Sequence, residues 1–216
     1  MKSSSIDSTA KLYPNVELGE GTTVEPFSII GIPDRFHPTT TTVLGRNSFI
    51  GSRCTIYSGV TAGDNFDISD QTTIFYNNQF GANCRIGPKA VIKNDCILGD
   101  QIRINSQVFM ERVIIHSNVF IGPGVIFADD LHPPCPKYEQ CVEKTIVESH
   151  VSIGANVTVA PGITIGHHSQ IYLGAVVISD VAPYSVMAGN PAKLIKDFRK
   201  LDCRSGFYNR PFEWWD

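Results

Sequence analysis

The sequence of 216 residues lacks several features that mark specialised classes of protein. It has no run of about 18 apolar residues, so no segment is long enough to cross a membrane as a helix. The N-terminal stretch MKSSSIDSTAKLYPNV contains no apolar core typical of a signal peptide, and we therefore expect a cytoplasmic location. A formal net charge of −3, without a basic aromatic-rich face, argues against a nucleic acid partner. An apolar fraction of 42% at this length favours one main globular domain.

What the sequence does contain is a repeat with a period of six residues. The spacing of six holds except at two breaks, after Ile30 and after Phe127, and at one dropped residue after Met110. The apolar positions of the repeat are Ile6, Leu12, Leu18, Val24, Ile30, Leu44, Ile50, Ile56, Ala62, Ile68, Ile74, Phe80, Ile86, Ile92, Leu98, Ile104, Met110, Ile115, Ile121, Phe127, Val147, Ile153, Val159, Ile165, Ile171 and Val177. All 26 are apolar, whereas the overall composition would give about 11. A period of six excludes an α-helix, which repeats near 3.6, and an ordinary antiparallel sheet, which alternates without a fixed six.

Glycine and asparagine occupy fixed places within the six-residue unit. Eleven of the 18 glycines follow the apolar position directly, and seven of the 12 asparagines stand three residues after it. Both residue types tolerate the left-handed backbone conformations that tight corners need. A short strand followed by a corner, three times per turn, predicts an all-β fold, a parallel β-helix of eight to nine coils.

Two breaks and a tail interrupt this pattern. Residues 31–43 and 128–146 are rich in proline and polar residues, and we expect them to form loops that project from the prism. The repeat ends at Pro183, which predicts a β-helix domain over residues 1–182 and a C-terminal segment over residues 183–216. Within that segment, residues 192–201 (AKLIKDFRKL) place Leu194, Ile195 and Phe198 on one face of a short capping α-helix. The aromatic tail after it is expected to pack on the body or on a neighbouring subunit.

The six cysteines include two recognisable sets. Cys54, Cys84 and Cys96 fall on the small inward position of the repeat and are expected to be buried thiols. Cys135 and Cys141 flank PKYEQ in the second loop, near His132. Together these three would give a His-x2-Cys-x5-Cys set, but the spacing is unfamiliar for zinc and a fourth ligand is missing. We therefore expect no metal site and treat the pair as loop packing.

Two stretches resemble a known family. Residues 153–196 (IGANVTVAPGITIGHHSQIYLGAVVISDVAPYSVMAGNPAKLIK) resemble the hexapeptide-repeat acyltransferases, and residues 119–134 (VFIGPGVIFADDLHPP) resemble the members that N-acetylate nucleotide-linked amino sugars. The resemblance covers the chain from Ile6 to Lys196. It implies a left-handed β-helix, acetyl-CoA as co-substrate, and a homotrimer with active sites between neighbouring subunits.

The resemblance implies an acetyl-CoA-dependent N-acetyltransferase that acts on a nucleotide-linked amino sugar in surface-polysaccharide biosynthesis. O-acetylation of a sugar or a small hydroxylated acceptor remains an alternative, because both reactions need a base in the same place. A catalytically inactive structural subunit is a second alternative, since FDISDQTTIFYN replaces the middle-coil Gly-His and Arg-Glu of many relatives. A β-helical carbonic anhydrase is disfavoured, because no His-x4-His pair exists.

Acyl transfer needs a base for the acceptor and donors for the developing oxyanion. His132 in the second loop is the first candidate for the base, with Asp129 or Asp130 orienting its imidazole. His116 is the second candidate, because it follows the one-residue slip in the repeat, and a slip often marks a bulge that re-aims side chains.

The resemblance also implies where the substrates bind. The thioester arm of CoA is expected along the last coils, at Ala160 and Pro161 and, one coil later, at Gly174 and Ala175. The cations expected to bind its phosphates are Lys193, Lys196 and Arg199. Arg35 and His37, in the first loop, are expected to contact the acceptor.

Overall fold

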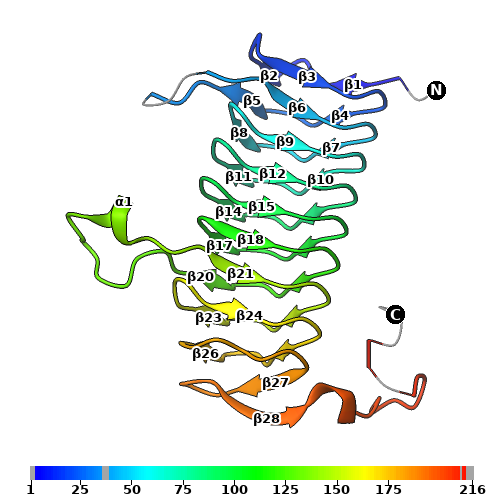
Figure 1. The fold of residues 1–216 in the computed structure, drawn as a ribbon. Helices are drawn as coiled ribbons and strands as arrows, with labels where there is room; N and C mark the ends of the chain where they lie inside the picture. Colours follow the sequence, from blue (N-terminus) through cyan, green and yellow to red (C-terminus); the bar gives the residue numbers. More distant parts are fainter. Residues whose placement is uncertain (1–2, 36–38, 210, 213–216) are drawn as a thin grey trace.

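The computed structural model describes residues 3–35, 39–209 and 211–212, which wind into a left-handed parallel β-helix with three flat sides (Figure 1). Each turn of the chain contributes one strand to each of three sheets, named A, B and C in the order in which the chain visits them. Sheet A holds ten parallel strands, sheet B nine and sheet C eight, so the prism has about nine turns, at the upper end of the expected eight to nine. After Val177, the last position of the repeat, the chain contributes one more parallel strand, residues 185–188 in sheet A.

The strands are two to five residues long. Sheet A comprises, in spatial order, β1 (Ser5–Ile6), β4 (Thr23–Val24), β7 (Phe49–Ile50), β10 (Asp67–Ile68), β13 (Arg85–Ile86), β16 (Arg103–Ile104), β19 (Phe120–Ile121), β22 (Ser152–Ile153), β25 (Gln170–Ile171), β27 (Ser185–Ala188) and β28 (Lys193–Asp197). Sheet B comprises β2 (Lys11–Leu12), β5 (Ile29–Ile32), β8 (Thr55–Tyr57), β11 (Thr73–Ile74), β14 (Val91–Ile92), β17 (Phe109–Met110), β20 (Ile126–Phe127), β23 (Thr158–Val159) and β26 (Val176–Val177). Sheet C comprises β3 (Val16–Leu18), β6 (Thr42–Leu44), β9 (Thr61–Ala62), β12 (Gln79–Phe80), β15 (Ile97–Leu98), β18 (Val113–Ile115), β21 (Thr145–Val147) and β24 (Thr164–Ile165).

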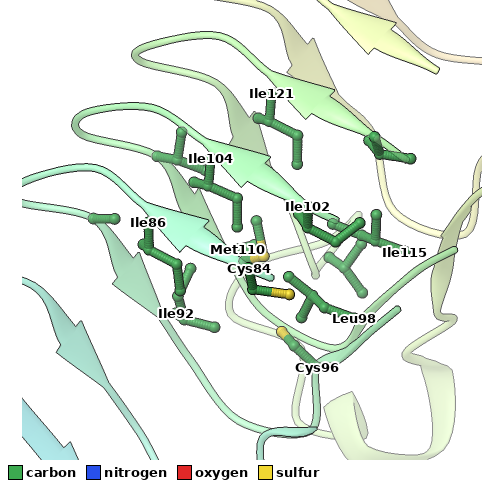
Figure 2. Close-up of a cluster of buried hydrophobic side chains, with 14 of the residues drawn as sticks. Cys84, Ile86, Ile92, Cys96, Leu98, Ile102, Ile104, Met110, Ile115 and Ile121 are labelled. Atoms are coloured by element: carbon green, nitrogen blue, oxygen red, sulfur yellow. The ribbon is translucent and has the colours of Figure 1, made fainter. Parts of the chain in front are cut away.

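The apolar positions of the repeat point into the prism and stack coil on coil (Figure 2). Of the 26, only the three in the first coil, Ile6, Leu12 and Leu18, are not fully buried, because no coil covers them from above. The small inward positions fill the corners between sheets. Cys54, Cys84 and Cys96 are completely buried there, as expected, and burial raises the pKa of their thiols to about 11, 11 and 12.

The predicted C-terminal α-helix is wrong. Residues 193–197 form strand β28, which runs antiparallel to β27, and only Phe198–Lys200 form a single 3₁₀ turn, η1. The backbone groups of β27 lie at the open edge of sheet A, and pairing with them satisfies residues 193–197 better than an isolated helix would. Phe198 is buried as the helical pattern predicted, but Leu194 and Ile195 are 64% and 54% exposed.

In the described part of the chain, the α-helical content is a single turn, α1 (Tyr138–Cys141), within the second loop. Among the described residues, no helix has the length and apolar character needed to cross a membrane.

Candidate active site

Both long loops leave the prism at the same edge, where sheet B turns into sheet C. Loop 1 (residues 33–41) connects β5 to β6, and loop 2 (residues 128–144) connects β20 to β21. Strand pairing continues past both loops. At loop 2, β17 pairs with β20 and β20 with β23, and at loop 1, β5 pairs with β8 with a register shift between Ile30 and Ile32. The two loops therefore project from one side of the molecule (Figure 1) and frame the intervening corners. We call this side the loop edge.

A pair of carboxyl groups lies at the foot of loop 2. Glu111 occupies the corner after β17, Asp129 lies one coil further on after β20, and their side chains are hydrogen-bonded to one another. Burial and then the charge of Asp129 raise the pKa of Glu111, while Lys93 and Arg112 oppose the rise. A carboxyl group donates a hydrogen bond to a carboxylate only in its protonated form, which the raised pKa of Glu111 favours. The pair can therefore release or accept one proton, as an acid–base catalyst must.

Cationic side chains flank this pair. The Nε atom of Arg112 lies 3.7 Å from the Oδ2 atom of Asp95, and the Arg112 side chain is only 14% exposed. Lys93 Nζ lies 4.6 Å from the centroid of the Phe75 ring. Asn94, between Lys93 and Asp95, is buried, and no group in the described chain donates to its Oδ1 atom. The edge thus combines carboxyl groups with cations, which suits a polar ligand.

Aromatic side chains continue the loop edge toward loop 1. The rings of Tyr57 and Phe75 stack with centroids 4.9 Å apart and planes inclined by 6°. Burial raises the pKa of Tyr76, and the negative charges of Asp34 and Asp95 add to the rise. Since Asp34 belongs to loop 1 and Asp129 to loop 2, charged groups from both loops act on the same edge.

The structure brings some of the residues predicted from sequence to this edge. Asp129 takes part in the carboxyl pair, and Asp130 and His132 follow it in loop 2. Oδ1 of Asp130 accepts a hydrogen bond of 2.7 Å from the backbone N–H of His132, so this oxygen binds the main chain and not the imidazole. His132 is exposed. Its role as a base remains a prediction.

Other predicted residues lie elsewhere or outside the described part. His116 follows β18 at the edge between sheets C and A, on the far side of sheet C from the loops. The expected bulge is wrong, because Ile97 pairs with Ile114 and Leu98 with Ile115 without a shift. The missing residue is lost from the corner before β18. Arg35 is exposed in loop 1, and His37 lies outside the described residues.

The predicted CoA contacts fall on two edges of the prism. Ala160 and Pro161 follow β23 at the loop edge, whereas Gly174 and Ala175 follow β25 at the edge between sheets A and B. Gly174 has a φ of +69°, and a Cβ atom built there meets no atom within 4 Å, so the backbone is open to a ligand. One chain does not bring the two sets together.

The three predicted cations lie beyond the last coil. Lys193 and Lys196 are exposed on β28. Arg199 binds Asp197 through two hydrogen bonds, of 3.0 and 2.7 Å, and its guanidinium lies 4.9 Å from the Tyr184 ring centroid. Of the three cations, Arg199 thus has the strongest interactions within its own chain.

The two loop cysteines approach one another. Cys135 Sγ and Cys141 Sγ are 3.9 Å apart. Within the described residues, no group of three or more His, Cys, Asp and Glu side chains is arranged to hold a metal ion.

Comparisons with known proteins agree with this architecture. The family model for the hexapeptide repeat of succinyl-transferase matches residues 41–69 and 144–178. A protein of Lysinibacillus sphaericus named as a probable macrolide acetyltransferase is 32% identical over 144 residues, 66% of this chain and 77% of that protein. A 2,3,4,5-tetrahydropyridine-2,6-dicarboxylate N-acetyltransferase of Brevibacillus brevis is 41% identical over 76 residues, 35% of this chain and 30% of that protein. The solved UDP-N-acetylglucosamine acyltransferase of Campylobacter jejuni superposes with a TM-score of 0.70 at 14% identity, over 93% of this chain and 79% of that chain.

The fold and the repeat define a hexapeptide-repeat protein of the left-handed β-helix class. The 32% sequence identity to a named acetyltransferase, over 77% of that protein's length, shows the family to which the chain belongs. The chain belongs to the hexapeptide-repeat acetyltransferases and is an enzyme of that type.

Glu111 is the main residue of this site that sequence reasoning missed. Its signal was present, because the one-residue slip in the repeat falls between Met110 and Ile115, in the corner that holds Glu111. The sequence alone relates the slip to the strand that follows it and thus points to His116. Only the stacking of successive coils places Glu111 beside Asp129.

Proposed function

We propose that this protein transfers an acetyl group from acetyl-CoA to the amine of a nucleotide-linked amino sugar, at the loop edge, in surface-polysaccharide biosynthesis. The hydrogen-bonded carboxyl pair of Glu111 and Asp129 is the observation that carries the proposal. The raised pKa makes the carboxylate of Glu111 a stronger base than an ordinary glutamate, which suits it to take a proton from an amine. The acidic groups Asp34 and Asp95 add to the attraction for a cationic amine.

The proton transfers follow from these residues. The amine nitrogen attacks the thioester carbonyl carbon, and the carbon–sulfur bond breaks as the carbon–nitrogen bond forms. The proton that leaves the nitrogen passes to the carboxylate form of the pair, and a proton returns to the departing thiolate. In this scheme the Glu111 carboxyl group holds the proton, and Asp129 orients that carboxyl group. Arg112 limits the negative charge that accumulates on the pair.

The two sets of predicted CoA contacts lie on different edges of the prism, so the proposed binding of CoA requires a site shared between subunits. Ala160 at the loop edge of one prism and Gly174 at the edge between sheets A and B of another can line the same thioester arm only if prisms stand side by side. The outward residues of sheets B and C suit such packing. From β5 and β6 onward they carry no formal charge at Ile29, Thr55, Thr73, Val91, Phe109, Ile126, Thr158 and Val176 in sheet B and Val43, Thr61, Gln79, Ile97, Ile114, Ile146 and Thr164 in sheet C. A homotrimer in the cytoplasm, where acetyl-CoA is available, is consistent with these features.

A hydroxyl acceptor is the second candidate, because the same carboxyl pair can take a proton from an alcohol. The acidic character of the loop edge favours the amine, which arrives as an ammonium ion and must lose one further proton. Parallel assays with nucleotide-linked amino sugars and with the corresponding hydroxy sugars separate the two.

The test compares variants for acetylated product by mass spectrometry. Glu111→Gln removes the acid–base group while keeping the shape, and we expect a fall in kcat of about 10²–10⁴-fold. His132→Ala tests the base predicted from sequence, and Glu17→Gln, on exposed strand β3, is the matched control. Full activity in Glu111→Gln together with loss in His132→Ala would transfer the role to His132. Absence of product with every acceptor in the wild type would refute the proposed function.

A further inference from the structure

A groove lies on the outer face of sheet A, on the opposite side of the prism from the loop edge. It has a volume of about 1030 Å³ and lies over β13, β16, β19 and β22, with Phe212 of the C-terminal tail against it. In Figure 1 the tail folds back beside the coils of this face. Because sheet A lies opposite the corner that joins sheets B and C, this groove is separate from the active site described above.

Two arginines stand side by side in the groove. Arg85 and Arg103 are direct partners in the β13–β16 ladder, so their side chains leave the sheet about 4.8 Å apart. Like charges directly opposite each other on a sheet are destabilising. Asp67, one coil earlier, offsets only part of this charge, with its Oδ2 atom 3.9 Å from Arg85 Nε. In the part of the chain that the structure describes, no carboxylate forms an ion pair with Arg103.

The remaining walls add hydrogen-bond donors and rings. Asn83, Gln101 and Asn118 form a column of side-chain amides along one rim, at the corners between sheets C and A. The Oδ1 atom of Asn83 already accepts a hydrogen bond of 3.0 Å from Asn65 Nδ2, which leaves the Asn83 amide nitrogen as the group available to a ligand. Phe120 and Phe212 supply apolar surface at the other end.

The lining residues of the groove therefore have one consistent character. They include two guanidinium groups, three amides and two phenyl rings, and none of the described residues that line the groove is an aspartate or a glutamate. Arginine pairs bind phosphate oxygens through paired hydrogen bonds, and phenyl rings stack on planar bases. The volume also matches pockets that hold ligands of this size.

We propose that this groove binds an aromatic base carrying a pyrophosphate, with Arg85 and Arg103 on the phosphates and Phe120 or Phe212 against the base. Two molecules of the proposed reaction contain this chemistry: the adenosine end of CoA and the nucleotide of the acceptor. Only the choice between these two sources rests on the proposed function. The inference that the groove binds a base with a pyrophosphate does not.

The test is isothermal titration of the full chain with adenosine 3′,5′-bisphosphate, with UDP and with inorganic pyrophosphate. We expect saturable binding of at least one nucleotide, weakened by added salt because the contacts are ionic. Arg103→Gln should weaken that binding by about tenfold or more, as expected for a lost charged hydrogen bond. Phe120→Ala should weaken nucleotide binding and leave pyrophosphate binding unchanged.

Arg53→Gln is the matched control, because Arg53 lies at the edge between sheets A and B, away from the groove. Its φ is +57°, a conformation that Gln71, Gln101 and Gln107 also adopt in this chain, so glutamine fits there. Preference for adenosine bisphosphate would assign the groove to CoA, and preference for UDP to the acceptor. Failure of both nucleotides to bind, or equal binding by the wild type and Arg103→Gln, would overturn the inference, even in a protein that still transfers acetyl groups.

Discussion

The carboxyl group of Glu111 is hydrogen-bonded to that of Asp129, although the two residues are in successive coils and only Asp129 belongs to an extruded loop. The stacking of coils makes this possible, since each corner lies directly above the corner one turn earlier. The foot of loop 2 is thereby fixed to the rigid prism, and its acid–base group is part of the scaffold and not of the loop.

The raised pKa of Glu111 predicts a pH-dependent contribution to stability. A folded state in which this carboxyl has a raised pKa binds more protons than the unfolded state, where the pKa is near 4.5. The free energy of unfolding must therefore fall as the pH rises from about 4.5 through the raised value. Urea unfolding across this range should show Glu111→Gln gaining stability relative to the wild type as the pH increases. A difference between the two proteins that does not change with pH would contradict the hydrogen-bonded pair.

Thiol reactivity should divide the six cysteines into two equal groups. Cys54, Cys84 and Cys96 are fully buried and have thiol pKa values of about 11, 11 and 12, so they lack both access and the reactive thiolate. The remaining three, Cys135, Cys141 and Cys203, are accessible. In native protein at mildly alkaline pH, a disulfide reagent should react quickly with three thiols per chain. The other three thiols should react only after denaturation. Rapid reaction of all six would show that the prism core is open.

Neighbouring residues in one strand provide a test of which face is buried. Ile92 is fully buried, whereas Val91, the residue before it in β14, points outward. Ile92→Ala should lower the free energy of unfolding by about 2–5 kcal/mol, because it leaves a cavity in a closely packed column. Val91→Ala should cost well under half of that. Equal costs would mean that the register of the coils is wrong.

The C-terminal strand can be distinguished from the helix that the sequence suggested. Leu194, in strand β28, is 64% exposed, whereas Phe198, in the 3₁₀ turn that follows, is 3% exposed. Phe198→Ala should therefore destabilise the protein by about 3–5 kcal/mol, as for other buried phenylalanines. Leu194→Ala should have an effect within about 0.5 kcal/mol, as at other exposed sites. Equal large losses for both would indicate a shared helical face.

The sequence predicted the prism well because the six-residue spacing directly determines which side chains point inward. It also predicted that the second loop begins at residue 128, whereas the first begins two residues later than expected, because residues 31 and 32 extend strand β5. The C-terminal helix was mispredicted because periodicity says nothing about the unpaired edge of β27, with which residues 193–197 pair. Glu111 was missed for a related reason. Its partner Asp129 is separated from it along the chain and becomes a neighbour only through coil stacking.

The experiment to perform first is isothermal titration of the purified wild-type protein with acetyl-CoA and with free CoA at the same concentration and pH. We expect saturable binding of both ligands, because an acetyltransferase must hold its donor before transfer and release the thiol product afterwards. No detectable heat from either ligand, in a protein that is folded by circular dichroism, would contradict an acetyl-CoA-dependent enzyme.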